Sequence, residues 1–218
     1  MKKIIALTAA LAAAAVPVAT AAKPPKPPRN AKLNSTVKPT AITFGKFVTT
    51  SGHLTSNTAN VPVELQADPY PFDGKWVTRG TKNTDAKGDV SFALAPDLNT
   101  KLRLQTSGAP KLTSAESTVT VAWRVGLRVS DSTPRKGQSI RFTGSVHPAH
   151  PGGTALIQKK TASGFKTVKS TVLKAASATF STYSARMRIR TTGTYRVRIP
   201  ADASHASGLS RTRTLTVG

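Results

Sequence analysis

The feature that most constrains the fold of this 218-residue chain is an internal repeat with a constant offset of 92 residues. The stretch FGKFVTTSGHL at 44–54 aligns with KGQSIRFTGSV at 136–146, and VELQ at 63–66 matches ALIQ at 155–158 in the same register. Self-similarity at a fixed offset is typical of one folding unit used twice. The sequence therefore predicts two tandem domains of about ninety residues each.

Within each copy, apolar and polar residues alternate, as at Ile140 and Phe142 or at Tyr195, Val197 and Ile199. A period of two indicates strands with one buried face. Glycines that signal turns recur between these stretches, which predicts about seven short strands in each copy. Short, regularly spaced antiparallel strands favour a β-sandwich.

Two stretches carry a resemblance to a known family: TDAKGDVSFAL at 84–94 and TGTYRV at 192–197. The pattern resembles the bacterial immunoglobulin-like (Ig-like) repeats that occur in tandem in secreted and surface proteins. It implies an all-β protein of two tandem Ig-like β-sandwich domains, in which Tyr195 would form the corner at the start of strand F. Val197 stands where antibody domains place a cysteine, and the chain has no cysteine. The fold must then rely on its apolar cores alone.

The N-terminal residues 1–22 predict a secretory signal peptide. Lys2 and Lys3 precede an apolar run that Pro17 ends, and small residues follow. The alternative is a membrane anchor, but the run is shorter than the ~20 apolar residues that span a bilayer. We therefore expect a secreted, extracellular protein with no transmembrane segment in the mature chain. Residues 23–37, rich in proline and lysine, predict an extended spacer, followed by domains at 38–123 and 124–218.

The charge is distributed unevenly between the two copies. The whole chain has a formal net charge of +23. Residues 40–123 hold 8 basic and 7 acidic side chains, whereas residues 124–218 hold 17 basic side chains and only Asp131 and Asp202 as acids. Because the copies share a strand pattern but not this charge, the fold does not require the basic residues.

The alternation of strand residues directs seven arginines of the second copy toward solvent. These are Arg128, Arg141, Arg186, Arg188, Arg190, Arg196 and Arg198. Guanidinium groups bind phosphate, sulfate or carboxylate with two parallel hydrogen bonds, so they are candidate contacts for an anionic polymer. Teichoic acid, acidic polysaccharide and extracellular DNA are the candidate partners, and charge alone would hold the protein at the cell wall. The competing explanation is solubility, since basic side chains also protect exposed strands from pairing.

A second functional hypothesis is an adhesin or accessory module that recognises a protein or neutral glycan through loops at the sandwich ends. Its candidate residues lie in two loop-rich stretches and are Tyr70, Phe72, Trp76, His147 and His150. Exposed aromatic rings would favour this hypothesis, whereas inward packing of Trp76 would weaken it.

No catalytic, metal or cofactor site is expected. His147 and His150 have the spacing i and i+3, but prolines and glycines place them in a loop without a cysteine or nearby acid to complete a metal shell. Asp85 and Asp89 in TDAKGD favour a hairpin turn over a calcium loop. No element for reading DNA sequence is present either. The sequence thus predicts a monomeric, non-enzymatic binding or structural protein.

Overall fold

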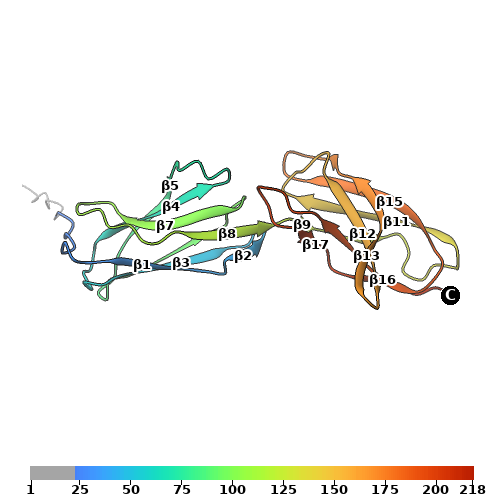
Figure 1. Ribbon diagram of the computed structural model, residues 1–218, viewed down its shortest axis with the longest axis horizontal. Helices are drawn as coiled ribbons and strands as arrows, with labels where there is room; N and C mark the ends of the chain where they lie inside the picture. Colours follow the sequence, from blue (N-terminus) through green and yellow to red (C-terminus); the bar gives the residue numbers. More distant parts are fainter. Residues whose placement is uncertain (1–22) are drawn as a thin grey trace, which may run out of the picture.

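The computed structural model describes residues 23–218, so the predicted signal peptide lies outside the described residues. These residues form 18 β-strands and no helix, and none of them could therefore cross a membrane as a helix. Figure 1 shows two groups of strands lying end to end, with residue 23 and the C-terminus near opposite ends of the long axis. We refer to residues 23–122 as the N-terminal half and to residues 123–218 as the C-terminal half.

The N-terminal half contains two sheets. One has the order β1-β3-β6 and the other the order β2-β8-β7-β4-β5, in which β2 and β8 pair in parallel. The strands are β1 Leu33–Lys38, β2 Ala41–Thr43, β3 Val48–Leu54, β4 Pro62–Pro69, β5 Val77–Asn83, β6 Asp89–Leu94, β7 Thr100–Thr106 and β8 Ser117–Ala122. Inward residues such as Val48, Leu65 and Leu102 form the core between the sheets.

The C-terminal half also contains two sheets. One has the order β10-β11-β15-β14, with β9 also paired to β11, and the other the order β13-β12-β16-β17, with β18 also paired to β16. The strands are β9 Arg124–Val125, β10 Arg128–Val129, β11 Gln138–His147, β12 Thr154–Thr161, β13 Gly164–Val172, β14 Lys174–Ala175, β15 Ser181–Ile189, β16 Gly193–Ile199, β17 Gly208–Leu209 and β18 Arg213–Leu215. A separate core contains Ile140, Phe142 and Ile157.

The repeat in the sequence is also a repeat in strand register. The bounds of β4 and β12 differ by the same offset of 92 as the matched sequences. Gly52 on β3 lies opposite Val90, and its counterpart Gly144 on β11 lies opposite Tyr183. A Cβ atom at Gly144 would clash with the carbonyl of Gly126, and the Tyr183 hydroxyl donates a 2.6 Å hydrogen bond to that same carbonyl.

One boundary expected from composition is wrong. Residues 33–37 do not belong to a spacer, because they lie in β1, which pairs along its length with β3. Leu33 and Val37 are only 4% and 5% exposed and pack in the core. The stretch LNSTVK has only two large apolar residues beside a proline-rich run, so its strand signal is weak. The inner face of β3 nevertheless needs this neighbouring strand to exclude water.

Candidate polyanion-binding surface

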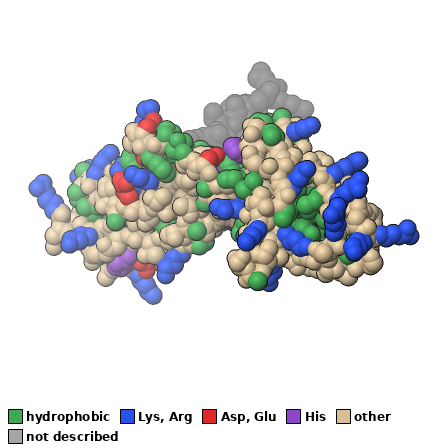
Figure 2. All heavy atoms as spheres, turned by 45° about the vertical axis from the view of Figure 1, so that its right-hand side comes forward, with side chains coloured by type: hydrophobic (Ala, Val, Ile, Leu, Met, Phe, Trp, Pro, Cys, Tyr) green, Lys and Arg blue, Asp and Glu red, His purple; other side chains and the backbone are tan. Residues whose placement is uncertain are grey.

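The outer surface of the sheet β10-β11-β15-β14 carries a group of exposed arginines. Arg141 on β11 lies directly opposite Arg186 on β15, and Arg188 lies opposite Ser139. Arg128 on β10 pairs with Thr143 on the other side of β11. We call this group the arginine face; its members are Arg128, Arg141, Arg186, Arg188 and, just after β15, Arg190. Figure 2 shows basic side chains over both halves; in this view those of the N-terminal half are interspersed with acidic side chains, whereas those on the front of the C-terminal half are not.

No acidic side chain among residues 23–218 forms an ion pair with the arginine face. The outward neighbours of these arginines on β11 and β15 are the hydroxyl residues Ser139, Thr143 and Ser184. Among residues 23–218, all four ion pairs involve histidine or lysine, and none involves an arginine. The guanidinium groups are thus exposed to solvent with their hydrogen-bonding capacity available to an external anion.

In the N-terminal half, uncharged residues stand at the positions that correspond to Arg128, Arg141 and Arg186. Through the shared register, the pair Arg141 and Arg186 corresponds to Thr49 and Ala93 on β3 and β6. Arg128 likewise corresponds to Thr36 on β1, since their partners Thr143 and Ser51 are 92 residues apart. The same strand arrangement therefore forms without the arginines, as the charge count of the two copies indicated.

Arg196 and Arg198 lie on a different surface. Both are on β16, in the sheet β13-β12-β16-β17, so the seven candidate arginines are divided between the two outer faces of the C-terminal half. The Arg196 guanidinium lies 3.9 Å from the centroid of the Phe165 ring, and its Nε donates a 2.9 Å hydrogen bond to Gln158 Oε1. Arg198 is exposed.

The aromatic residues between β4 and β5 pack on one another or on an arginine. Tyr70 is 36% exposed and packs edge to face on Phe72, with ring centroids 5.8 Å apart. Trp76 is half-buried and does not enter the core. Instead, the guanidinium of Arg103 lies 3.9 Å from its ring centroid and covers one face of the indole.

His147 and His150 both make internal contacts. The His147 ring packs against Phe180 at a centroid distance of 5.3 Å. Burial, assisted by the nearby charge of Arg124, lowers the pKa of His147 below its ordinary value. His150 stacks on Trp123 at 4.5 Å. Both side chains are half-buried, and one face of each imidazole packs on an aromatic ring.

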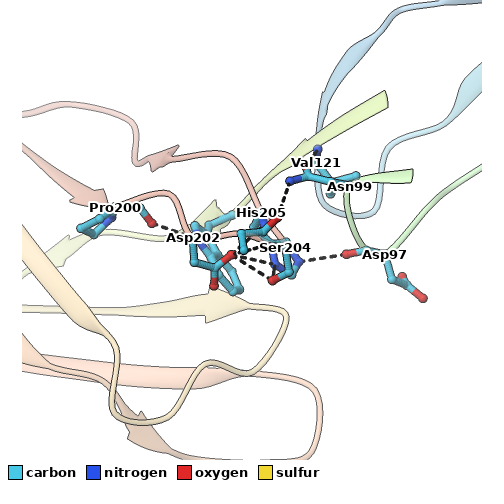
Figure 3. A network of polar contacts seen from close by, with 9 residues as sticks. Asp97, Asn99, Val121, Pro200, Asp202, Ser204 and His205 are labelled. Atoms are coloured by element: carbon cyan, nitrogen blue, oxygen red, sulfur yellow. Dashed lines mark hydrogen bonds and ion pairs between the residues drawn. The ribbon is translucent and has the colours of Figure 1, made fainter. Parts of the chain in front are cut away.

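Sequence reasoning missed the joint between the two halves, which Figure 3 shows. His205 is 3% exposed and stacks on Trp123 at 3.9 Å. The Nε1 of Trp123 donates to the carbonyl of Pro200 at 3.1 Å, and His205 Nε2 donates to the carbonyl of Asp97 at 2.9 Å. Because Asp97 belongs to the N-terminal half, this imidazole links the two halves directly.

The joint also has a defined electrostatic character. Burial lowers the pKa of the His205 imidazole, although the Asp97 carbonyl and the Asp202 carboxylate oppose this shift. The Asn99 backbone of the N-terminal half donates to the carbonyl of Ser204 at 2.9 Å. A tryptophan at the boundary was visible in the sequence, but no local pattern indicated that a histidine so far along the chain would pack on it.

No metal-binding group of three or more His, Cys, Asp or Glu side chains is found among residues 23–218. In the TDAKGD segment, Asp85 Oδ1 accepts hydrogen bonds from the backbone nitrogens of Lys87 at 2.8 Å and Asp89 at 2.9 Å. These bonds hold the carboxylate in a tight turn before β6 and lower the pKa of Asp85. Tyr195 is buried, and its hydroxyl makes no hydrogen bond with the described residues, so the expected tyrosine corner is not formed by this side chain.

Comparison with known proteins gives no family assignment. No protein-family model matches the chain, and no curated protein matches it. Among solved structures, it is similar to one described as "Crystal structure of tetra-tandem repeat in extending region of large adhesion protein". That superposition has a TM-score of 0.37 and 15% sequence identity, and it covers 85% of this chain and 49% of the other. The chain thus spans about half the length of that structure.

Proposed function

We propose that the chain is a secreted, monomeric, non-enzymatic protein of two Ig-like domains, in which the second domain binds an anionic polymer outside the cell. The strand order supports the domain type. If β10, β11, β14 and β15 are taken as strands A, B, D and E, the first sheet of the C-terminal half reads A-B-E-D. The second sheet contains the strands that correspond to C, F and G, as expected for an Ig-like sandwich.

The observation that carries the binding proposal is the unpaired arginine face. Like charges directly opposite on neighbouring strands oppose folding by up to about 1 kcal/mol per pair, and Arg141 faces Arg186 in this way. A polyanion laid across the sheet would remove this repulsion and accept bidentate hydrogen bonds from the guanidinium groups. The N-terminal half has no counterpart of this arginine pair, because Thr49 and Ala93 occupy its positions.

The partner is proposed by its chemistry, as a linear polymer with repeated phosphate, sulfate or carboxylate groups. Wall teichoic acid, acidic polysaccharide and extracellular DNA all have this character. Binding that depends on several neutralised charges weakens steeply as salt rises, because counterions are released on association. A surface that served solubility alone would show only weak, unsaturable attraction to any polyanion.

The test measures binding of the chain from Lys23 onward to immobilised teichoic acid, heparin and duplex DNA. In the loss variant, three members of the arginine face are replaced by uncharged residues of the kind found in the N-terminal half: Arg141→Thr, Arg186→Ala and Arg188→Ala. We expect the affinity near 0.1 M salt to fall by roughly a hundredfold, since each phosphate contact contributes a slope of about 0.9 in log affinity against log salt.

The matched control removes three exposed charges from the N-terminal half, by Lys46→Ser, Arg79→Ser and Lys87→Ser. Both variants lose three positive charges, so a difference between their affinities does not arise from net charge. Equal losses in the two variants would refute the arginine face as a binding surface and would favour the solubility explanation.

The exposed ring of Tyr70 favours a second candidate function, recognition of a neutral glycan by the loop at 68–76. A tyrosine that is 36% exposed beside Phe72 offers an aromatic surface on which a sugar ring can stack. Tyr70→Ala should then abolish retention on a glycan array at high salt, where attraction between charges is screened. Unchanged retention would exclude this loop as the contact.

A further inference from the structure

The two halves share an arrangement of three side chains, on the outer face of the sheet β13-β12-β16-β17 in one half and of the sheet β2-β8-β7-β4-β5 in the other. In the C-terminal half, Gln158 Oε1 accepts a 2.9 Å hydrogen bond from Arg196 Nε, and the guanidinium lies 3.9 Å from the Phe165 ring centroid. In the N-terminal half, Gln66, Arg103 and Trp76 repeat this arrangement with the same two distances. Each glutamine follows an irregularity in the pairing of its strand.

This arrangement fixes the orientation of the guanidinium of Arg196. The ring of Phe165 sets the plane of the group, and the hydrogen bond to Gln158, which is only 5% exposed, sets its rotation in that plane. With Nε occupied, the side edge of the guanidinium is blocked to an incoming anion. The two terminal nitrogens have no hydrogen-bond or ion-pair partner among residues 23–218, and they form an end-on fork that can donate two parallel bonds.

The surroundings of the two arginines differ in charge. In the N-terminal half, Gln66 donates to Glu64 Oε2 at 3.0 Å, and the buried carboxylate of Asp68 lies two residues further along the same strand. The offset of 92 places Leu156 where Glu64 stands and Lys160 where Asp68 stands. The C-terminal copy therefore keeps the oriented arginine and lacks both neighbouring acids.

We infer that the terminal nitrogens of Arg196 form a preorganised subsite for a single oxyanion group: a phosphate, sulfate or carboxylate. This inference rests on the proposed function, because such a group would be one unit of the bound polymer. Orientation before binding lowers the entropy cost of ordering a long side chain. Arg198 lies on the same face of β16, about 7 Å along the strand, and would meet the next anionic group of an extended polymer. Arg103, beside Glu64, is excluded from this role by the repulsion of that carboxylate for an anion.

The direct test uses the side-chain Nε–H signals of Arg196 and Arg103 in nuclear magnetic resonance spectra of the chain from Lys23 onward. The probes are inorganic phosphate, sulfate and acetate, each added at constant ionic strength against sodium chloride. We expect a saturable shift of the Arg196 signal and no shift of the Arg103 signal. The ranking of the three probes identifies whether phosphate, sulfate or carboxylate is preferred. Shifts of equal size at both arginines, or none at Arg196, would overturn the inference.

A second test uses Arg196→Lys, which keeps the positive charge but removes the fork. We expect a fivefold to tenfold loss of affinity for heparin with an unchanged salt slope, because the number of charges is the same. Arg103→Lys is the control, because it loses the equivalent contacts with Trp76 and Gln66. It should bind heparin as the wild type does. Binding by Arg196→Lys at wild-type affinity would contradict the subsite.

The outcomes separate this inference from the proposed function. If the loss variant of the arginine face binds heparin normally while Arg196→Lys does not, the arginine face is wrong and the subsite stands. The converse result retains the arginine face and eliminates the subsite. Melting temperatures of Arg196→Lys and Arg103→Lys, compared with each other, report the structural cost of losing the stacked guanidinium in each half.

Discussion

Where the C-terminal half sets Arg141 opposite Arg186, the N-terminal half sets Thr49 opposite Ala93. The two pairs occupy equivalent places in the ladders β11–β15 and β3–β6, whose strands bury comparable apolar residues on their inner faces. The difference shows that the inward-facing residues of the strands specify the fold, while the outward-facing residues are free to vary. A property confined to outward positions therefore concerns association with other molecules more than folding.

The joint between the halves adds a second contrast. Each half closes around its own apolar core, whereas the contact between them depends on Trp123, His205 and hydrogen bonds to backbone carbonyls. The polar joint has a titratable group at its centre. Its strength should therefore respond to pH, unlike the apolar cores on either side.

The largest expected effect concerns the two superposed glycines. A methyl group at Gly144 would meet the backbone carbonyl of Gly126 and the hydroxyl of Tyr183, whereas at Gly52 it would meet mainly the end of the Leu104 side chain. Because a flexible side chain yields more easily than backbone, we expect Gly144→Ala to cost about 2–4 kcal/mol and Gly52→Ala about 1–2 kcal/mol of unfolding free energy. Urea denaturation measures both, and equal costs would show that the two interiors are packed alike.

Acidification should weaken the joint. Folding lowers the pKa of His205, so as pH falls the unfolded chain takes up its proton first, at about 6.5. Stability is then lost as pH falls through that value, and His147, whose pKa is also lowered, contributes with the same sign. The melting temperature should be lower at pH 5.0 than at pH 7.5, and this dependence should be reduced in His205→Gln.

His53→Gln, on an exposed side chain of the N-terminal half, is the matched control for the pH experiment. If His53→Gln reduced the pH dependence as much as His205→Gln does, the joint would not be its source.

The smallest expected effect is a gain of stability on removal of one arginine. Arg186→Ala eliminates the facing pair with Arg141 and should raise the free energy of unfolding by about 0.2–1 kcal/mol at low salt. The gain should shrink at high salt, because exposed charges are screened. In the reciprocal variant, Ala93→Arg, the new arginine lies opposite Thr49 and not opposite another arginine. Its effect on the free energy of unfolding should therefore not depend on salt in this way. Denaturation at 0.02 M and 0.5 M salt tests both variants.

The sequence predicted a large part of this structure because a repeat with period-two alternation leaves few choices. It indicated the β-strands, the matched glycines and the outward direction of Arg141 and Arg186, all of which depend on local pattern. It missed β1, where Leu33 and Val37 are the only large apolar residues of the strand. A strand with so few such residues is recognised only once its neighbour β3 is known.

Contacts between distant residues were beyond the reach of local pattern. The stacking of His205 on Trp123 arises because the loop after β16 returns to the boundary between the halves. The bond between Gln158 and Arg196 also joins separate strands. A signal for the latter did exist, since Gln66 and Gln158 match within the repeat, and a matched polar residue in a buried strand indicates a shared hydrogen bond.

In our proposal the arginines, and not the sandwich that carries them, confer binding to polyanions. Relocation tests it most directly. In the loss variant lacking Arg141, Arg186 and Arg188, three arginines are introduced on the outer surface of the sheet β1-β3-β6, by Thr36→Arg, Thr49→Arg and Ala93→Arg. These positions correspond to Arg128, Arg141 and Arg186 of the arginine face. The measurement is heparin affinity as a function of salt. We expect the loss variant to bind weakly with a shallow slope, and relocation to restore most of the affinity and the steep slope. A loss variant that binds as tightly as the wild type would contradict it.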